Sequence, residues 1–397
     1  MRWRVGGAIL LVLVALGAVN YLRPVPATAA VAQLPSTDRV PGTAPSLPWP
    51  ATGSAAVGVS GLGFIASSGN EHAGPAASVT KVMTALVLLE DKPLKKGDNG
   101  PTVTITDADV QAYQSELKDQ STVKVVAGET LTELQLLQGM LIPSANNLAE
   151  TLARWDAGSL DAFVAKMNAK AKALHLTHTT FADVSGSSPS SVSTPTDLLA
   201  LGMVAMQNEV VADTVGRAQV DLPVAGTVFN VDGELGKPGG IIGIKTGSGF
   251  NTGANFLYAA TATVDSRKIT IYGCVMGQPT LAIAFSSAHT LIDAMSAVLH
   301  VRRVVARNQA VATFNTPWGD ATDVIAQVDL DLTEWPGLIV RQRLDVNPVV
   351  FDHPVPRSTI VGSEHVVLGD YVEDVPLLTA DPMYPPGRVW RLTRLSF

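Results

Sequence analysis

The sequence is poor in cysteine, in charged residues and in aromatic residues. Cys274 is the only cysteine among 397 residues, so the chain can form no internal disulfide and no zinc site built from several cysteines. Charged residues make up only 16%, and 28 Lys plus Arg face 35 Asp plus Glu, which gives a formal net charge of −7. This balance argues against the large basic surface that a nucleic-acid partner needs. The 46% of hydrophobic residues nevertheless suffices for a large core, and the length predicts roughly two to three domains.

The N-terminus has the composition of an export segment. Arg2 and Arg4 precede a nearly unbroken apolar run over residues 5–22, and two small-residue patterns suited to cleavage follow within 27–32. The run approaches the ~20 residues that span a bilayer. We therefore expect an exported protein whose residues 1–23 are a signal peptide or a membrane anchor, with the anchor slightly favoured.

The remainder divides into three segments. Seven prolines between residues 24 and 50 disfavour helix and sheet, so residues 24–51 are predicted to be a spacer. Residues 52–302 mix helical and strand patterns, and 303–397 read as an all-β domain because polar and apolar residues alternate between Pro or Gly turns. The expected helices are 78–90, 131–141, 145–154, 160–174, 196–207 and 281–299, and the expected strands are 55–61, 63–68, 240–246, 254–264 and 268–276.

A serine paired with a lysine is the first candidate for chemistry. Ser-x-x-Lys occurs at Ser78/Lys81, Ser115/Lys118 and Ser121/Lys124, so the pattern is weak by itself. Only the Ser78 pair opens a strongly apolar helix, where residues three apart share a face. A lysine held there loses hydration, which favours the neutral amine that can accept a serine proton. The other two pairs lie in a polar stretch that is typical of solvated surface.

Two further motifs follow along the chain. Ser144-Ala145-Asn146 stands where one helix ends at Pro143 and the next begins, so a turn can project two short polar side chains into a cleft. Lys245-Thr246-Gly247 ends an apolar strand, and Gly247 lacks a side chain where a substrate backbone would lie alongside. The ordered set of three motifs is a much stronger signal than any one of them.

The segments ASVTKVMTALVLLE, LIPSANNLAE and IIGIKTGSG resemble the three motifs of the penicillin-binding, active-site-serine D,D-peptidases. Within that family the sequence is most similar to the low-molecular-weight D-alanyl-D-alanine carboxypeptidases. The resemblance covers residues 52–300 well and the tail loosely. It implies an α/β (α+β) catalytic domain of the serine D,D-peptidase/β-lactamase-like fold, followed by the C-terminal all-β domain.

The resemblance also implies a reaction, a partner and a location. Peptidoglycan stem peptides ending in D-Ala-D-Ala would be the substrates, β-lactams would acylate the same serine, and no cofactor or metal is required. The protein would act at the outer face of the bacterial cytoplasmic membrane or in the cell wall or periplasm. It would be held to the membrane by its N-terminal segment if that segment is not cleaved.

The same resemblance assigns a role to each motif residue. Ser78 would be the nucleophile, Lys81 the base and Ser144 the proton relay. Asn146 would bind the substrate amide, and the backbone N–H groups of Ser78 and Ser248 would form the oxyanion hole. The remaining substrate contacts would come from the third motif, with Lys245 supplying positive charge, Gly247 giving room, and Thr246 and Ser248 binding the terminal carboxylate.

Two stretches depart from the family pattern. Some carboxypeptidases carry a basic residue in an Asn-x-Asn stretch that helps to hold the terminal carboxylate, but Asn230-Val231-Asp232 offers Val231 there. The second motif is Ser-Ala-Asn followed by Asn147, where the family more often shows Ser-Gly-Asn followed by Asp. We expect the second departure to be tolerated, because the side chains of Ser144 and Asn146 are retained.

Two alternative functions remain open from the sequence. A β-lactamase-like hydrolase would need an extra carboxylate to activate water, and no Glu stands out between residues 181 and 202. A catalytically weak cell-wall-binding scaffold of the same fold is the other alternative, although all three motifs are intact. Cys274, on an apolar strand, is interpreted as a small core residue.

Overall fold

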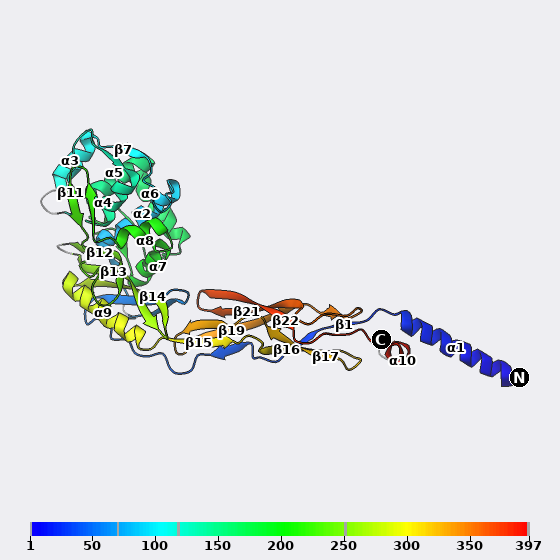
Figure 1. Ribbon diagram of the computed structural model, residues 1–397. Helices are drawn as coiled ribbons and strands as arrows, with labels where there is room; N and C mark the ends of the chain where they lie inside the picture. Colours follow the sequence, from blue (N-terminus) through cyan, green and yellow to red (C-terminus); the bar gives the residue numbers. More distant parts are fainter. Residues whose placement is uncertain (1, 70, 117–119, 250–251, 395–397) are drawn as a thin grey trace. The chain divides into compact units, whose positions relative to one another are not determined.

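The computed structural model describes residues 2–69, 71–116, 120–249 and 252–394, and the chain forms two compact units (Figure 1). One unit is Pro45–Leu299. The other combines Met1–Ala44 with His300–Phe397.

The Pro45–Leu299 unit contains a five-stranded antiparallel sheet in the order β12-β13-β14-β4-β5. Its strands are β4 (Ser54–Val59), β5 (Gly63–Ser67), β12 (Ile241–Gly249), β13 (Gly253–Val264) and β14 (Arg267–Gln278). The β13–β14 hairpin turns at Asp265 and Ser266, whose φ angles of 46° and 68° are those of a primed two-residue turn. The smaller strands of this unit are β6 (Gly74–Pro75), β7 (Thr102–Thr104), β8 (Thr130–Thr132), β9 (Val192–Ser193), β10 (Gln219–Leu222) and β11 (Gly226–Phe229).

Helices cover both faces of this sheet. Neighbouring residues of a strand point to opposite faces. Phe256 of β13 makes an edge-to-face ring contact with Phe285, at 4.8 Å between centroids, whereas a Cβ atom on Gly202 would lie 2.8 Å from Leu257. Phe285 belongs to α9 (Leu281–Ser296) and Gly202 to α7 (Pro195–Ala205), so the sheet lies between these helices.

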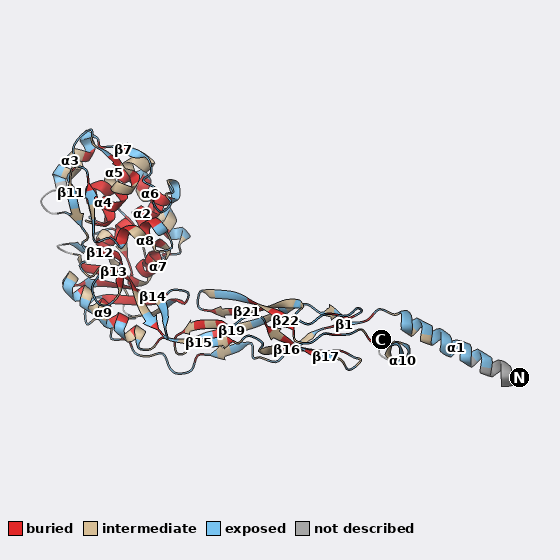
Figure 2. Ribbon diagram, viewed as in Figure 1, coloured by how far each residue is buried: buried red, intermediate tan, exposed pale blue. Residues whose placement is uncertain are grey.

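The remaining helices form a cluster around α2 (Thr80–Asp91). Ten of its residues are buried, from Thr80 to Leu89, as expected for the strongly apolar stretch (Figure 2). The short 3₁₀ helix η1 (Ala77–Val79) leads directly into it. The other helices of this unit are α3 (Asp107–Glu116), α4 (Glu133–Leu141), α5 (Asn146–Ala157), α6 (Leu160–Ala173) and α8 (Glu209–Val215).

The second unit is built on a seven-stranded antiparallel sheet in the order β2-β16-β17-β22-β21-β19-β3. Its elements are α1 (Arg2–Leu22), β1 (Ala27–Thr28), β2 (Ala30–Ala32), β3 (Thr37–Arg39), β15 (His300–Val305), β16 (Ala310–Asn315), β17 (Ala321–Ala326), β18 (Leu330–Glu334), β19 (Ile339–Val346), β20 (Val349–Val350), β21 (Ile360–Leu368), β22 (Tyr371–Thr379) and α10 (Arg388–Thr393). Its many strands agree with the alternation of polar and apolar residues over 303–397 in the sequence.

Residues 24–51 are not the unbonded spacer that their prolines predict. Strand β2 pairs with β16, and β3 pairs with β19, so this segment supplies both edge strands of the seven-stranded sheet. The physical reason is that proline is tolerated beside edge strands, which bond on one side only. Pro35 lies between the two strands and interrupts neither.

The N-terminal helix contacts the C-terminal one. Arg394 is buried against the end of α1 and donates hydrogen bonds to the carbonyl oxygens of Asn20 (2.7 Å), Arg23 (2.6 Å) and Pro24 (3.0 Å). Within the described residues, no single helix is long and apolar enough to cross a membrane. Leu10–Leu22, the C-terminal part of α1, is a shorter apolar helix. Helices α7 and α8 reach the required length only as a pair, which is bent by 109°.

Candidate active site

Ser78 and Lys81 lie together at the start of the buried α2 helix. Ser78 is in η1, directly after Ala77, whose φ of 48° is in the left-handed region. Lys81 is one turn later and fully buried. Its Nζ atom lies 2.9 Å from Ser78 Oγ, so the i,i+3 spacing brings the two functional atoms within hydrogen-bond distance.

Within the described residues, Lys81 Nζ also contacts two hydrogen-bond acceptors. It donates to Asn146 Oδ1 at 2.6 Å and to the Ser185 carbonyl oxygen at 2.8 Å. A neutral amine has two N–H groups and one lone pair. If these two acceptors take the two N–H groups, the lone pair is left facing the Ser78 hydroxyl, which is the arrangement that a general base needs.

The second motif turns sharply into the same region. Ser144 is 3% exposed and has a φ of 67°, a strained value for a residue with a side chain. Asn146 begins α5 and its Nδ2 donates to Gln120 Oε1 at 3.0 Å. Among the described residues, no hydrogen bond joins the Ser144 hydroxyl to Ser78 or Lys81.

Asn147, the departure from the family pattern, has a structural role. Its Oδ1 accepts from the backbone N–H of Val123 at 3.0 Å, and its Nδ2 donates to the Val123 carbonyl at 2.9 Å. An amide is suited to this position because it both accepts and donates. The side chain is fully buried and ties residue 123 to the start of α5.

The third motif runs along β12 beside the nucleophile. A Cβ atom on Gly247 would lie 3.1 Å from Ser78 N and 3.0 Å from the Ala76 carbonyl oxygen, so only glycine fits comfortably there. Thr246 is buried and Ser248 is exposed. Asn255, which faces Gly247 across the strand pair, donates to the carbonyl oxygens of Pro75 (2.8 Å) and Ala76 (3.1 Å).

Lys245 is buried beside an acidic neighbour. Burial lowers the pKa of Lys245 to about 7, against the opposing field of Asp232. Burial likewise raises the pKa of Asp232 to about 6. Asp232 Oδ1 accepts from the Glu234 N–H at 3.0 Å, while Oδ2 is buried without a hydrogen-bond partner in the described structure. Charge in this part of the site therefore depends on two groups that titrate near neutral pH.

Sequence reasoning missed three contributors to this region. The Asn255 side chain donates to backbone carbonyl oxygens, and Ser185 contributes its own carbonyl oxygen, so no side-chain motif reveals either contact. Asp183 organises the loop that contains Ser185, and it lies between residues 181 and 202, where a β-lactamase-like hydrolase would need its extra carboxylate. Hydrogen bonds from the loop occupy both of its oxygens, so it is not placed to activate water.

The other two candidate serines have different settings. The Ser121 carbonyl oxygen accepts from the Asn146 N–H at 2.8 Å, so the Ser121 backbone borders the site. Ser121 and Lys124 are both exposed. Ser115 Oγ donates to the Ala112 carbonyl at 2.9 Å, and Lys118 lies outside the described residues. Cys274 is fully buried, which confirms its core position, and burial raises the pKa of its thiol.

A buried lysine lies within hydrogen-bond distance of a half-buried serine, and a glycine-containing strand runs alongside. This arrangement is suited to acyl transfer through a serine. The comparisons agree with this class. The sequence profile described as D-alanyl-D-alanine carboxypeptidase matches residues 61–280. The D-alanyl-D-alanine carboxypeptidase DacB2 of Mycobacterium tuberculosis is 35% identical over 229 residues, which cover 55% of this chain and 73% of that protein.

Solved structures show the same fold. The Streptomyces K15 DD-transpeptidase matches with a TM-score of 0.56 and 26% identity, covering 65% of this chain and all of that one. A peptidoglycan synthesis regulatory factor (PBP3) from Streptococcus pneumoniae matches with a TM-score of 0.65 and 19% identity, covering 84% of this chain and 99% of that one. The chain belongs to the D-alanyl-D-alanine carboxypeptidase family and is a serine hydrolase with the fold of the penicillin-binding D,D-peptidases.

Proposed function

We propose that the enzyme removes the terminal D-Ala from peptidoglycan stem peptides through an acyl-enzyme on Ser78. The observation that carries this assignment is the buried Lys81, whose Nζ lies 2.9 Å from Ser78 Oγ and is fixed by two acceptors. Ser78 Oγ attacks the carbonyl carbon of the penultimate D-Ala while its proton passes to Lys81. The proton is then delivered to the departing amine, and water later releases the shortened peptide.

Ser144 is the proposed carrier of the proton to the leaving group. Its placement on a strained turn two residues before Asn146 supports this role, because Asn146 contacts Lys81. The Asn146 amide would hold the substrate amide. In the free enzyme Asn146 Nδ2 is occupied by Gln120 Oε1, so substrate binding would exchange that contact for a substrate carbonyl.

The oxyanion is proposed to lie between the backbone N–H groups of Ser78 and Ser248. Ser78 stands at the N-terminal end of η1 and α2, where the helix dipole favours negative charge. The close approach of Gly247 to Ser78 N brings the two backbones near each other. Preorganised N–H donors of this kind stabilise charge that develops in the transition state.

The terminal carboxylate of the substrate would be held by Lys245, Thr246 and Ser248. Val231 is 37% exposed and offers no charge, so Lys245 is the proposed source of positive charge in this part of the site. β-Lactams, which mimic the same dipeptide, are proposed to acylate Ser78.

We also propose that the enzyme is exported and held at the outer face of the bacterial cytoplasmic membrane by α1. The apolar side chains of Leu10–Leu16 are largely exposed on this helix, which supports a lipid environment for it. Cleavage of residues 1–23 as a signal peptide would leave the export assignment unchanged.

The assignment is tested by mass spectrometry of the purified protein after penicillin treatment, followed by peptide mapping. A single adduct on the peptide that contains Ser78, together with D-Ala release from a D-Ala-D-Ala peptide, is expected. Ser78→Ala should abolish both while the protein keeps its thermal unfolding temperature. An adduct on Ser115 or Ser121, or labelling that persists in Ser78→Ala, would refute it.

A further inference from the structure

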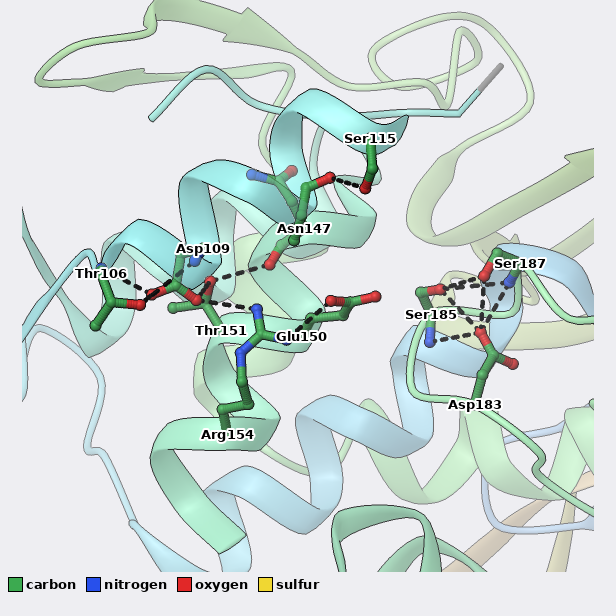
Figure 3. A network of polar contacts seen from close by, with 11 residues as sticks. Thr106, Asp109, Ser115, Asn147, Glu150, Thr151, Arg154, Asp183, Ser185 and Ser187 are labelled. Atoms are coloured by element: carbon green, nitrogen blue, oxygen red, sulfur yellow. Dashed lines mark hydrogen bonds and ion pairs between the residues drawn. The ribbon is translucent and has the colours of Figure 1, made fainter. Parts of the chain in front are cut away.

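The carboxylate of Asp183 accepts hydrogen bonds from several residues of the loop formed by residues 183–191. Figure 3 shows its contacts with Ser185 and Ser187. Its Oδ2 accepts from the N–H groups of Ser185 (3.2 Å), Gly186 (2.8 Å) and Ser187 (2.9 Å), and from the hydroxyls of Ser185 (2.9 Å) and Ser187 (3.2 Å). Its Oδ1 accepts from the Ser191 hydroxyl at 2.5 Å. One side chain thus fixes both ends of the loop.

This loop lies directly against the start of α2. The carbonyl oxygen of Val184 accepts from Thr84 Oγ1 at 2.6 Å, and that of Ser185 accepts from Lys81 Nζ at 2.8 Å. Gly186 has a φ of +80°, and a Cβ atom there would lie 1.8 Å from the Ala77 carbonyl oxygen. The loop backbone is therefore held in contact with the residues on both sides of Ser78.

We propose that Asp183 is a positioning residue for the reaction, because its carboxylate holds the loop that directs the Ser185 carbonyl at Lys81. This inference rests on the proposed role of Lys81 as the base. The Ser185 carbonyl takes one of the two N–H groups of the neutral amine, so a displaced carbonyl would let the amine rotate. The lone pair would then no longer face Ser78 for most of the time.

Asp183 is ionised at neutral pH, so its carboxylate can act as a permanent hydrogen-bond acceptor. Burial acts to raise the pKa of Asp183, but the hydrogen bonds from Ser191, Ser185 and Ser187 outweigh burial and hold the pKa below its usual value. The group is therefore an anion at neutral pH. Because both oxygens are engaged, Asp183 acts through the loop and not on the substrate.

The test compares Asp183→Ala, Asp183→Asn and Asp197→Ala. The readout is the first-order rate constant of labelling by a saturating fluorescent penicillin, measured across a range of pH. In such an experiment the amplitude of labelling measures how many molecules can react, whereas the rate constant measures how fast those molecules are acylated. A loss of folded protein therefore does not imitate the proposed effect.

Asp183→Ala is expected to lower the rate constant about 10- to 100-fold, the range that a misplaced catalytic group costs. The midpoint of the acid limb of its pH profile should move to lower pH, because the carbonyl that favours the charged amine is lost. Asp183→Asn should recover most of the rate, since an amide oxygen still accepts from the loop. The KM for a D-Ala-D-Ala peptide should change less than about twofold in each variant.

Asp197→Ala is the matched control. Asp197 is a buried carboxylate that likewise holds a nearby segment, because it accepts from the His178 N–H at 2.8 Å and from Thr179 Oγ1 at 2.7 Å. It makes no contact with the Ser185 loop among the described hydrogen bonds. Its variant should lose stability without changing the labelling rate constant or the pH midpoint.

A milder pair covers the case in which Asp183→Ala does not fold. Ser191→Ala removes the hydroxyl that donates to Oδ1 of Asp183, whereas Ser190→Ala changes an exposed neighbour. A several-fold slower rate constant in Ser191→Ala alone supports the proposal. Wild-type rate constants and pH midpoints in Asp183→Ala or Ser191→Ala would overturn it. An equal loss in Asp197→Ala would overturn it as well.

The proposed function would be refuted by a different result from the one that refutes the role of Asp183. If Lys81→Met were labelled at the wild-type rate, Lys81 would not be the base, whatever Asp183 does. If Lys81→Met were inactive and Asp183→Ala normal, only the positioning role would be lost.

Discussion

Gly247 lies so close to Ser78 that a Cβ atom on Gly247 would come within 3.1 Å of the Ser78 backbone nitrogen. The same Cβ atom would lie 3.0 Å from the Ala76 carbonyl oxygen and 3.2 Å from Ala77 Cβ. Asn255 holds this segment from the neighbouring strand through the carbonyl oxygens of Pro75 and Ala76. The nucleophile and the third motif are therefore separated by a fixed, narrow distance.

Gly247→Ala tests that distance. The added methyl group must push β12 away from Ser78 by a few tenths of an ångström, which would widen the proposed oxyanion hole. We expect penicillin acylation to slow about 10- to 100-fold with little change in thermal stability. The measurement is the acylation rate of Gly247→Ala against Gly74→Ala, which places its methyl group in open space. Equal rates in both variants would contradict the prediction.

Substitutions of Lys81 and Lys245 are expected to impair the enzyme in different ways. Lys81→Met removes the proposed base and keeps most of the side-chain volume, so acylation should fall by about 10²- to 10⁴-fold while a D-Ala-D-Ala peptide still binds. Lys245→Ala removes the proposed charge for the carboxylate, so turnover and acylation should fall together and binding should weaken. Acylation rates and peptide affinity, measured on both variants, separate the two roles. Full acylation of Lys81→Met would exclude it as the base.

The pH dependence of substrate binding should follow Lys245. With a pKa of about 7, Lys245 is mostly charged below that pH and mostly neutral above it. The KM for a peptide with a free terminal carboxylate should therefore rise as the pH increases through about 7. Asp232 favours the charged form of Lys245, so in Asp232→Asn the rise in KM should begin at a lower pH. Steady-state kinetics on both proteins tests this, and a pH-independent KM would contradict it.

The motifs could be found from the sequence because their geometry is local. Ser78 and Lys81 are one helical turn apart, and Gly247 is fixed by the strand that contains Lys245. The β13–β14 hairpin was predictable for the same reason, since its turn at Asp265 and Ser266 follows directly from the chain. Each of these features depends on neighbours within a few residues.

Contacts between distant backbone groups could not be found in this way. The Ser185 carbonyl meets Lys81 across 104 residues, and nothing in the identity of Ser185 requires it. Strands β2 and β3 pair with partners more than 270 residues away, so the prolines that flank them predict unpaired chain as long as these partners are unknown. Such pairings depend on the completed fold, which short sequence patterns do not record.

Glu133 offers a test of stability that is separate from catalysis. It is almost fully buried at the start of α4, and its Oε1 has no partner in the described part of the chain. Burial raises the pKa of Glu133 to about 7, despite the opposing charge of Lys92. The native state therefore holds this proton more tightly than the unfolded state, and its contribution to stability is lost as the pH rises from about 4.5 through 7.

Glu133→Gln should remove this dependence. At about pH 8 the variant should be more stable than the wild type by roughly 1–2 kcal/mol, or a few degrees in Tm, and at about pH 4.5 the two should be similar. Thermal unfolding at both pH values provides the measurement. Glu209→Gln, at an exposed helix start, should show no such gain. A variant that is less stable than the wild type at pH 8 would mean that the ionised carboxylate is stabilised.

The position of β2 and β3 leads to a prediction about truncation. A protein that starts at residue 24 keeps both edge strands of the seven-stranded sheet, whereas one that starts at residue 45 loses them and exposes the edges of β16 and β19. Unpaired edges promote association between chains.

If α1 is a retained anchor, the full chain should fractionate with membranes, and the first truncation should be soluble, monomeric and labelled by penicillin. The second should unfold at a lower temperature and aggregate, although Ser78 is still labelled in its soluble fraction. N-terminal sequencing of the mature protein decides between anchor and signal peptide: a start at Ala30 or Gln33 would mean cleavage, and a start at Ala30 would still retain β2. Equal stability of the two truncated proteins would show that β2 and β3 contribute little to the sheet.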